Sequence, residues 1–150
     1  MSFVDTYALR GAGRTLEILA LRRGPNGRNP GSWETVHGTI EPGETPVQAS
    51  LRELREETGL VPAKFYNLSR TEAFYQHRTN ELALIPVFAA FVAPEVTVQL
   101  SAEHDRAEWL RPRDAAERFA WPRERRAVDD ILSIVGGGDA DLLEDVLRVS

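Results

Sequence analysis

The chain has 150 residues, a formal net charge of −5 and no cysteine. The absence of cysteine excludes disulfides and thiolate metal sites, and the negative charge argues against a protein that binds a nucleic-acid polymer through a basic face. No apolar run approaches the ~18 residues of a membrane span and the N-terminus carries no signal-peptide pattern, so we expect a cytoplasmic protein with no membrane partner. At this length we expect a single domain over residues 1–150.

Strand patterns dominate the first part of the chain. Residues 3–10 and 16–21 are largely apolar stretches on either side of a glycine turn, and we expect a strand in each. A loop rich in glycine, proline and asparagine follows at residues 24–32. Residues 33–36 are then expected to form a short strand.

Three side chains around this loop are candidates for substrate binding. Arg22 and Arg23 follow the second strand, where two guanidinium groups would suit phosphate oxygens; the alternative is a solvated strand end. Trp33 comes directly after the loop, and it either stacks on a base or fills the core.

The stretch from Gly38 to Leu60 combines a turn with a helix. Thr45 is a suitable N-cap, Pro46 fits the first helical position, and Gly59 is placed to end the helix. At about 100° per residue, one face of this helix is a stripe that should pack on a core, made of Val47, Leu51, Leu54 and Thr58.

Three carboxylates gather on the opposite face of the same helix: Glu53, Glu56 and Glu57. Neighbouring carboxylates repel one another and raise each other's pKa values. A divalent cation reverses that penalty, because Mg²⁺ requires hard oxygen ligands. The alternative is an acidic helix face in contact with water alone.

The second half of the chain alternates apolar stretches with polar turns. We expect strands at residues 65–68, 70–75 and 81–92, a further short strand at 96–100, and a polar loop that runs into a strand over 103–110. Pro86 interrupts the longest of these stretches and indicates an edge strand or a bulge.

Helix patterns close the chain. We expect helices at residues 112–119 and 122–135, each with a proline in its first turn, and an amphipathic helix at 139–148 after the flexible break Gly136–Gly138. The last helix is expected to pack on its own domain, with a dimer contact as the alternative. Strands followed by helices on this scale predict a mixed sheet with helices on both faces.

The stretch around the carboxylates also fits a longer pattern, G-x5-E-x7-R-E-U-x-E-E-x-G-U, in which U is a bulky aliphatic residue. Every fixed place is filled: Gly38, Glu44, Arg52, Glu53, Leu54, Glu56, Glu57, Gly59 and Leu60. This is the signature of the Nudix hydrolases, and the chain resembles that family. The resemblance implies an α/β fold, the Nudix α/β/α sandwich, with a mixed sheet between helices.

The resemblance also implies a metal site. The cofactor would be Mg²⁺, with Mn²⁺ as the alternative, and its ligands would be the backbone carbonyl of Gly38 and the carboxylates of Glu53, Glu56 and Glu57. Glu53 matches a ligand or a general base. Arg52 would support catalysis by pairing with a neighbouring glutamate and holding the carboxylates in place.

A further acid outside this stretch is Glu103, which lies shortly before Trp109. That spacing resembles family members in which the acid binds a metal, so we expect Glu103 to be a ligand or the general base. His104 and Asp105 are its neighbours and substitutes for that role. The alternative for Glu103 is a solvated loop acid.

Residues outside the motif are loosely similar to the dihydroneopterin triphosphate pyrophosphohydrolase group, and those that carry the similarity are Arg22, Arg23, Trp33, Val36, Glu103, His104, Trp109, Leu110 and Trp121. The chain departs from that group at Glu34 and His37, where neutral residues are usual. From this resemblance we expect magnesium-dependent cleavage of a nucleoside or pterin triphosphate to a monophosphate and pyrophosphate.

Two other functions stay open at this point. Tyr75 is placed as in some diadenosine polyphosphate hydrolases, so such a substrate, or another nucleoside diphosphate linked to a second group, is one alternative. A Nudix module that binds nucleotides without cleaving them is the other. In each case the partner is a small nucleotide, and we expect a monomer or a homodimer.

Overall fold

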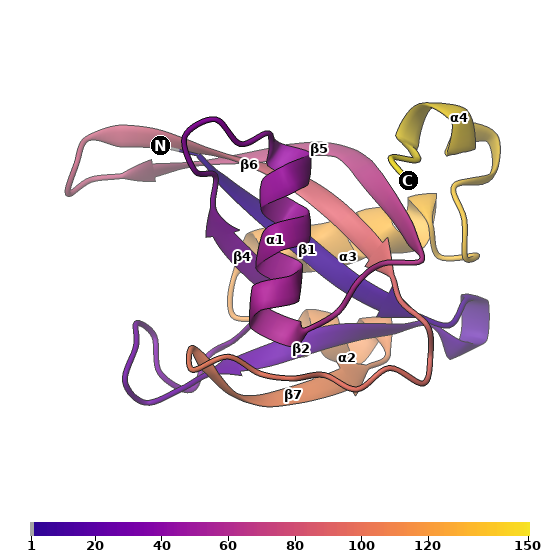
Figure 1. Cartoon of the computed structure of the whole chain (residues 1–150), viewed down its shortest axis with the longest axis horizontal. Helices are drawn as coiled ribbons and strands as arrows, with labels where there is room; N and C mark the ends of the chain where they lie inside the picture. Colours follow the sequence, from indigo (N-terminus) through magenta and orange to yellow (C-terminus); the bar gives the residue numbers. More distant parts are fainter. Residues whose placement is uncertain (1) are drawn as a thin grey trace.

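The protein, described by a computed structural model over residues 2–150, is a mixed sheet enclosed by helices (Figure 1). The strands are β1 (Phe3–Arg10), β2 (Glu17–Arg23), β3 (Trp33–Glu34), β4 (Val36–Thr39), β5 (Lys64–Gln76), β6 (Glu81–Phe91) and β7 (His104–Leu110). The helices are α1 (Pro46–Thr58), α2 (Pro112–Arg118), α3 (Pro122–Ile134) and α4 (Glu144–Leu147), with short 3₁₀ turns η1 (Gly13–Thr15) and η2 (Asp141–Leu143). Of the helices in residues 2–150, none is long and apolar enough to cross a membrane.

The sheet opens into a wedge beside its central strand. The strand order is β3-β2-β1-β6-β5, and β1 runs parallel to β6 but antiparallel to β2. The second half of β1 pairs with β2, at Leu9 and Ile18, whereas its first half pairs with β4, at Thr6 and Val36. Toward its end, β2 pairs with β3 along one edge, and along its other edge it pairs with β7. The chain from β3 to β4 therefore fills the space where β1 and β2 part.

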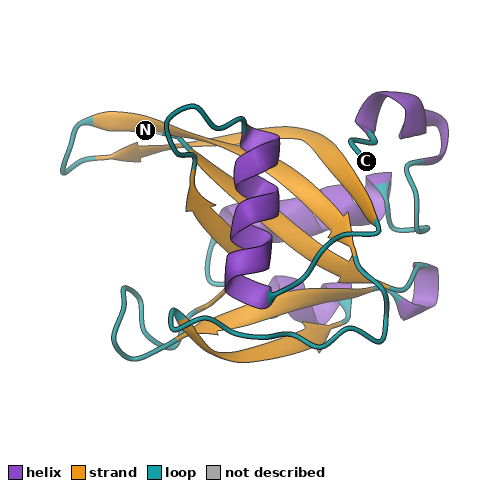
Figure 2. Cartoon of the chain, in the orientation of Figure 1, coloured by secondary structure: helices purple, strands orange, loops and turns teal. Residues whose placement is uncertain are grey.

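Helices lie on both faces of the sheet (Figure 2), and an apolar layer lies between the sheet and the helices on each face, as the predicted sandwich requires. Because successive side chains of a strand face opposite sides, β1 sends Val4 and Ala8 toward α1 but Tyr7 and Leu9 toward α2 and α3. The stripe expected on α1 packs as predicted, with Leu54 and Thr58 buried and Val47 and Leu51 partly buried.

Two details of the predicted strands are corrected. Residues 96–100 form no strand; the backbone N–H of Gln99 donates to the carbonyl of Thr58 at 2.8 Å, which ties the segment to the end of α1 and not to a sheet. β5 is one long strand whose pairing with β6 is irregular between Asn67 and Thr71, and Thr71 lies opposite Pro86. The proline thus marks a bulge, and the edge alternative is wrong because β6 lies between β1 and β5.

The chain beyond the glycine break is less regular than predicted. The single amphipathic helix expected at residues 139–148 is replaced by η2, which begins at Asp141 with a left-handed φ of 48°, and by α4, which follows it directly. Leu147 is buried in the core below α3, but Leu142 and Val146 are 93% and 77% exposed. The expected packing on the domain therefore applies to only part of the apolar side.

Candidate active site

Local hydrogen bonds set the bounds and register of α1. The Thr45 hydroxyl accepts from the Gln48 backbone N–H at 3.2 Å, and the Gln48 side chain accepts from the Thr45 N–H at 2.9 Å. At the other end Gly59 adopts a left-handed φ of 73°, which a glycine does without strain. The predicted start and stop of the helix are confirmed, so the spacing of its glutamates is that of an α-helix.

Arg52 joins α1 to the loop that precedes it. Its Nε and Nη2 donate to the two oxygens of Glu44 at 2.7 and 2.9 Å, and Nη2 also donates to the carbonyl of Thr39 at 2.9 Å. Nη1 donates to Glu53 at 2.7 Å and to Glu56 at 3.3 Å. The Arg52 guanidinium lowers the pKa of the Glu44 carboxyl to about 2. Loop and helix are thus clamped together by one planar cation.

Glu53 is seated directly beneath Gly38 of β4. A Cβ atom at position 38 would lie 2.1 Å from Cδ of Glu53, so a side chain there would displace the carboxylate. Burial raises the pKa of Glu53, although the bond from Arg52 acts in the opposite direction. The glycine is therefore needed for close approach, not for an unusual backbone angle.

The glutamates of α1 do not share one environment. The Glu56 side chain is 58% exposed, whereas Glu57 is only 3% exposed, and within residues 2–150 nothing hydrogen-bonds its Oε2 atom. Burial, with the charges of Glu53 and Glu103 nearby, raises the pKa of Glu57 to about 10. The alternative of an acidic helix face in contact with water alone is therefore wrong for Glu57.

A second group of residues reaches Glu57 from the start of β7. Glu57, Glu103 and His104 each offer an atom that could bind a metal, and these atoms lie within 4.8 Å of one another. His104 is fully buried, and its Nε2 lies 2.8 Å from Oε2 of Glu34. Glu34 in turn accepts a hydrogen bond from Nη1 of Arg23 at 3.0 Å. The structure thus brings Glu103 and His104 beside Glu57 of α1.

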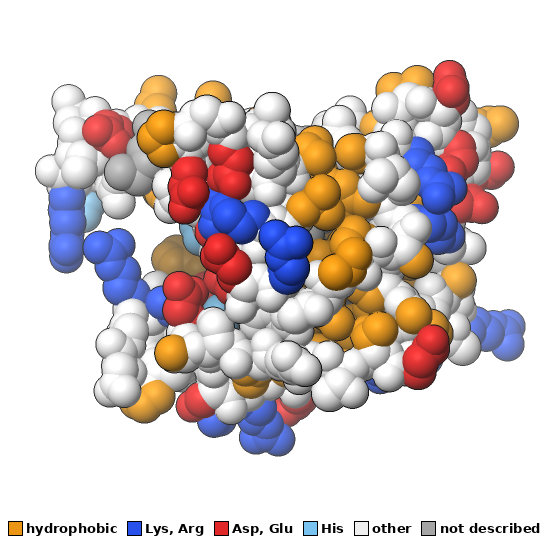
Figure 3. Space-filling view, in the orientation of Figure 1, with side chains coloured by type: hydrophobic (Ala, Val, Ile, Leu, Met, Phe, Trp, Pro, Cys, Tyr) orange, Lys and Arg blue, Asp and Glu red, His pale blue; other side chains and the backbone are white. Residues whose placement is uncertain are grey.

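A cavity of about 630 Å³ adjoins this group, and Arg23 and Glu34 belong to its wall. In Figure 3 the molecule is hollowed between the β5–β6 hairpin and the loop of residues 24–32, with basic side chains along the rim. The wall also holds the aromatic rings of Phe3, Phe74, Tyr75 and Trp121, so Tyr75, singled out from the sequence, lies at this cavity.

Asp5 organises the deepest charges of this cavity. It is 1% exposed, and its carboxylate contacts Nδ1 of His37 at 2.7 Å and accepts from Nε of Arg123 at 2.8 Å. Although burial opposes ionisation, the bonds and charges of His37 and Arg123 lower the pKa of Asp5. His37 and Arg123 both line the cavity, so their positions are set from below by a buried carboxylate.

Two of the residues expected to bind substrate lie outside the cavity wall. Arg22 pairs with Asp105 at 2.8 Å on the neighbouring strand. Trp33 packs against the core on the side of α2 and α3, with the guanidinium of Arg118 4.7 Å from its ring centroid. Successive residues of a strand face opposite sides, which separates Arg22 from Arg23.

Arg123 is a wall residue that the sequence did not single out. It occupies the first turn of α3, far along the chain from Asp5, and only the packing of α3 against the sheet brings the two together. The Trp121–Pro122 pair immediately before it is the one local signal, since it marks where the helix begins.

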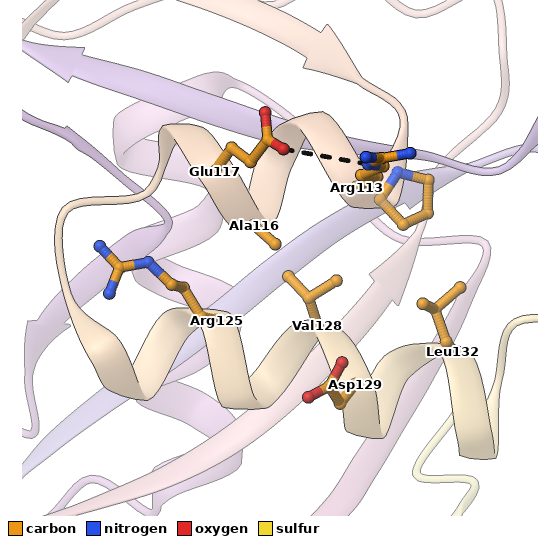
Figure 4. A pocket seen from close by; sticks show the side chains of 8 residues that line it. Arg113, Ala116, Glu117, Arg125, Val128, Asp129 and Leu132 are labelled. Carbon is orange, nitrogen blue, oxygen red and sulfur yellow. Dashed lines mark ion pairs between the residues drawn. The ribbon is translucent and has the colours of Figure 1, made fainter.

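A separate hollow of about 440 Å³ lies between α2 and α3 (Figure 4). Ala116, Val128 and Leu132 form its apolar part, and Arg113 and Glu117 make a 3.9 Å ion pair at its rim. None of the carboxylates of α1 lines this hollow. α3 lines both hollows, with Arg123 and Arg126 at the larger one and Val128 and Leu132 at this one.

Comparison with known families agrees with this geometry. The family model for the NUDIX domain matches residues 4–131. The chain therefore belongs to the NUDIX family, as the motif from Gly38 to Leu60 predicts.

Curated relatives share part of their length with this chain. It is 36% identical over 129 residues to an octanoyltransferase from Myxococcus xanthus, a match that covers 85% of this chain and 36% of that protein. It is 30% identical over 92 residues to the nucleoside triphosphatase NudI from Escherichia coli, covering 57% of this chain and 65% of that protein. The chain thus spans about a third of the first relative and just under two thirds of the second.

Solved structures share the fold. An Ap4A hydrolase from C. elegans superposes with a TM-score of 0.75 at 20% identity, over 91% of this chain and 98% of that one. The dihydroneopterin triphosphate pyrophosphohydrolase of E. coli superposes with a TM-score of 0.68 at 24% identity, over 87% and 94%. The dihydroneopterin triphosphate pyrophosphohydrolase group, to which residues outside the motif are loosely similar, is therefore represented among the structural neighbours.

Proposed function

We propose that this chain is a metal-dependent hydrolase of phosphoric anhydride bonds, which cleaves a nucleoside or pterin triphosphate between the α and β phosphorus atoms. The products are a monophosphate and pyrophosphate. One observation carries the proposal: Glu57 and Glu103 converge beside a cavity whose wall holds arginines and aromatic rings. Such a substrate has an anionic phosphate chain, which the arginines would bind, and a flat ring, on which the aromatic side chains would stack.

The donor set fits a divalent cation. Glu57 is a buried carboxyl group with an unpartnered oxygen among the described residues, and a cation would satisfy it. The side groups that would hold the ion are carboxylates, which suit Mg²⁺, with Mn²⁺ as the alternative. We assign this role to Glu53, Glu56, Glu57, Glu103 and the backbone carbonyl of Gly38. When bound, the ion would neutralise charge on the phosphate oxygens.

The residues around this set have separate tasks. Arg52 orients Glu53 and Glu56 through its fork of donors. Glu103 is exposed and adjoins the buried Glu57, so we assign it the role of the general base that takes the proton of the attacking water. Glu53 is the alternative base. Glu44 and the backbone carbonyl of Thr39 anchor Arg52 in turn.

The cavity is suited to the rest of the substrate. Its volume of about 630 Å³ is that of a small-molecule site, since such pockets commonly measure about 300–1,000 Å³. Arg23 adjoins both the cavity and Glu34 and would contact the phosphate chain, whereas Phe74 or Trp121 would stack on the ring. Because stacking discriminates weakly between rings, we expect several bases to be accepted within about tenfold.

The decisive experiment is product analysis with Mg²⁺ across nucleoside triphosphates, dihydroneopterin triphosphate, ADP-ribose and diadenosine polyphosphates. We expect pyrophosphate from the triphosphates, and a raised KM for them in Arg23→Ala. Arg106→Ala, which removes an exposed arginine of β7, is the matched control and should behave as the wild type. Preference for ADP-ribose or a diadenosine polyphosphate would overturn the triphosphate assignment, and no turnover of any nucleotide would indicate a binding module.

A further inference from the structure

His104 is a buried imidazole with one nitrogen unused. Its side chain is 0% exposed, and in the described part of the chain no hydrogen-bond partner reaches Nδ1. The residue opens β7, opposite Arg23, at a point where the register between β2 and β7 shifts. Such a bulge re-aims side chains, and here it leaves an imidazole inside the protein beside Glu57 and Glu103.

The hydrogen bond to Glu34 decides which nitrogen is free. Glu34 is paired with Arg23, and a carboxylate in an ion pair accepts hydrogen bonds but does not donate them. Nε2 of His104 must therefore carry the proton in the 2.8 Å contact with Glu34. In a neutral ring that leaves a lone pair on Nδ1. A carboxylate that orients an imidazole in this way is the usual support of a metal-binding histidine.

We propose that His104 is a nitrogen ligand of the cation at this site, so that the ion is held by an imidazole together with the carboxylates of Glu57 and Glu103. Glu57 and His104 belong to the same small group, and each carries an unpartnered buried atom, Oε2 and Nδ1 respectively, that one ion would satisfy. If His104 only supported Glu34, the role of Nε2 would be explained, but Nδ1 would remain buried with neither a hydrogen-bond partner nor a ligand.

The chemistry of the ligand determines what the site selects. Carboxylates alone favour Mg²⁺ and Mn²⁺, whereas an imidazole adds affinity for Co²⁺ and other later divalent metals. We therefore expect Co²⁺ to bind much more tightly than Mg²⁺. We also expect bound Mn²⁺ to show a directly bonded nitrogen. This inference rests on the metal site assigned under the proposed function, but it can be tested without substrate.

The test is pulsed electron paramagnetic resonance of Mn²⁺ bound to the full chain, which detects coupling to an imidazole nitrogen. We expect that coupling in the wild type and its loss in His104→Gln. Glutamine can still donate an N–H to Glu34 but has no atom equivalent to Nδ1, so it separates the ligand from the support. Calorimetry without nucleotide should show Co²⁺ affinity falling by at least about tenfold, the loss typical of disturbed metal sites, with Mg²⁺ affinity much less affected.

Control variants keep the test decisive. The chain has 3 histidines, so His77→Gln, on the exposed β5–β6 turn, should leave the nitrogen coupling unchanged. If His104→Gln does not fold, the double variant His37→Gln/His77→Gln leaves a single imidazole and should retain the coupling. Mn²⁺ bound with no nitrogen coupling, or coupling that survives in folded His104→Gln, overturns the inference while leaving triphosphate hydrolysis standing. Nitrogen coupling without turnover of any triphosphate overturns the proposed function alone.

Discussion

At the scale of single residues, Glu57 is the side chain whose behaviour depends most on its surroundings. Burial raises its pKa to about 10, so without a cation the group is neutral at pH 7. A glutamine has nearly the same shape and is also neutral, which makes Glu57→Gln a mild change for the metal-free fold. The same substitution removes a ligand charge, which makes it a severe change for catalysis.

We therefore expect Glu57→Gln to lower kcat by at least ~10², as for other losses of charge stabilisation, with the metal-free melting temperature close to that of the wild type. Mg²⁺ should raise the melting temperature of the wild type by binding the folded state, and much less that of the variant. Steady-state kinetics and thermal melts measure both effects. Glu41→Gln, a largely exposed neighbour of Arg52, is the control. Activity that survives both Glu57→Gln and EDTA would rule out the metal site.

Glu103 differs from Glu57 in being open to water, which suits a group that must exchange protons. Glu103→Gln should reduce kcat by roughly 10²–10³ while KM changes little, because the lost interaction belongs to the transition state. A variant within threefold of the wild type would move the base to Glu53. Glu108→Gln, on the strand β7 that follows Glu103, is a suitable control for the change of charge.

At the scale of elements, β4 and α1 are matched by the contact of Gly38 with Glu53. Gly38→Ala would place its Cβ 2.1 Å from Cδ of Glu53, and the flexible carboxylate would move away. We expect a large loss of kcat but only about 1–3 kcal/mol of unfolding free energy, the usual cost of an added methyl group in a packed site. Denaturant titration and kinetics separate the two. Gly137→Ala, where a Cβ meets nothing within 4 Å, should alter neither.

The segment from β3 to β4 is held by a buried acid of α3. The Glu124 side chain accepts from the backbone N–H of Thr35 at 2.7 Å and from that of Trp121 at 3.1 Å. Burial and the charge of Asp5 raise the pKa of Glu124, whereas these two bonds and Arg123 lower it, and the net result is about 8. The position of the cavity wall thus depends on a side chain that gains a proton on folding.

This gives a pH dependence with a definite sign. Between the ordinary pKa of 4.5 and the folded value of about 8, the folded protein holds a proton that the unfolded chain has released. The stabilisation is complete below pH 4.5 and is lost as the pH rises toward 8. Glu124→Gln should cost about 1–3 kcal/mol at pH 5, because one buried N–H loses its acceptor, and less at pH 8. Urea titrations at both pH values check this, with exposed Glu117→Gln as control; a difference that grows with pH would contradict it.

At the scale of the whole molecule, the last residues close the sheet at β5. The backbone N–H of Val149 donates to the carbonyl of Phe65 at 2.7 Å, and Leu147 is buried in the core shared with α3. Leu147→Ala should cost about 2–5 kcal/mol, and Leu142→Ala, at a side chain 93% exposed, should change stability by less than about 0.5 kcal/mol. Neither side chain lines the cavity, so kcat should be unchanged in both. A loss of activity in folded Leu147→Ala would show that the chain end supports the site.

Much of this protein follows from the sequence alone, because the determinants are local. Thr45, Pro46 and Gly59 bound α1 through contacts within a few residues, and the 3.6-residue period then places Leu54 on the core. Family, fold class and most strands follow from the same kind of short-range pattern. The division of the last helix into η2 and α4 was missed because a 3₁₀ turn and an α-helical turn have nearly the same apolar spacing.

Tertiary structure alone decided which acids are buried and which residues meet. Helical periodicity puts Glu56 and Glu57 side by side, but only the tertiary fold buries Glu57 and leaves Glu56 in water. The pairing of β2 with β7 brings Arg22 to Asp105, and the packing of α3 against the sheet brings Arg123 to Asp5. Burial and long-range contact depend on how distant segments are layered, and the pKa of a carboxyl group follows from that layering, so neither can be read from the order of residues along one helix.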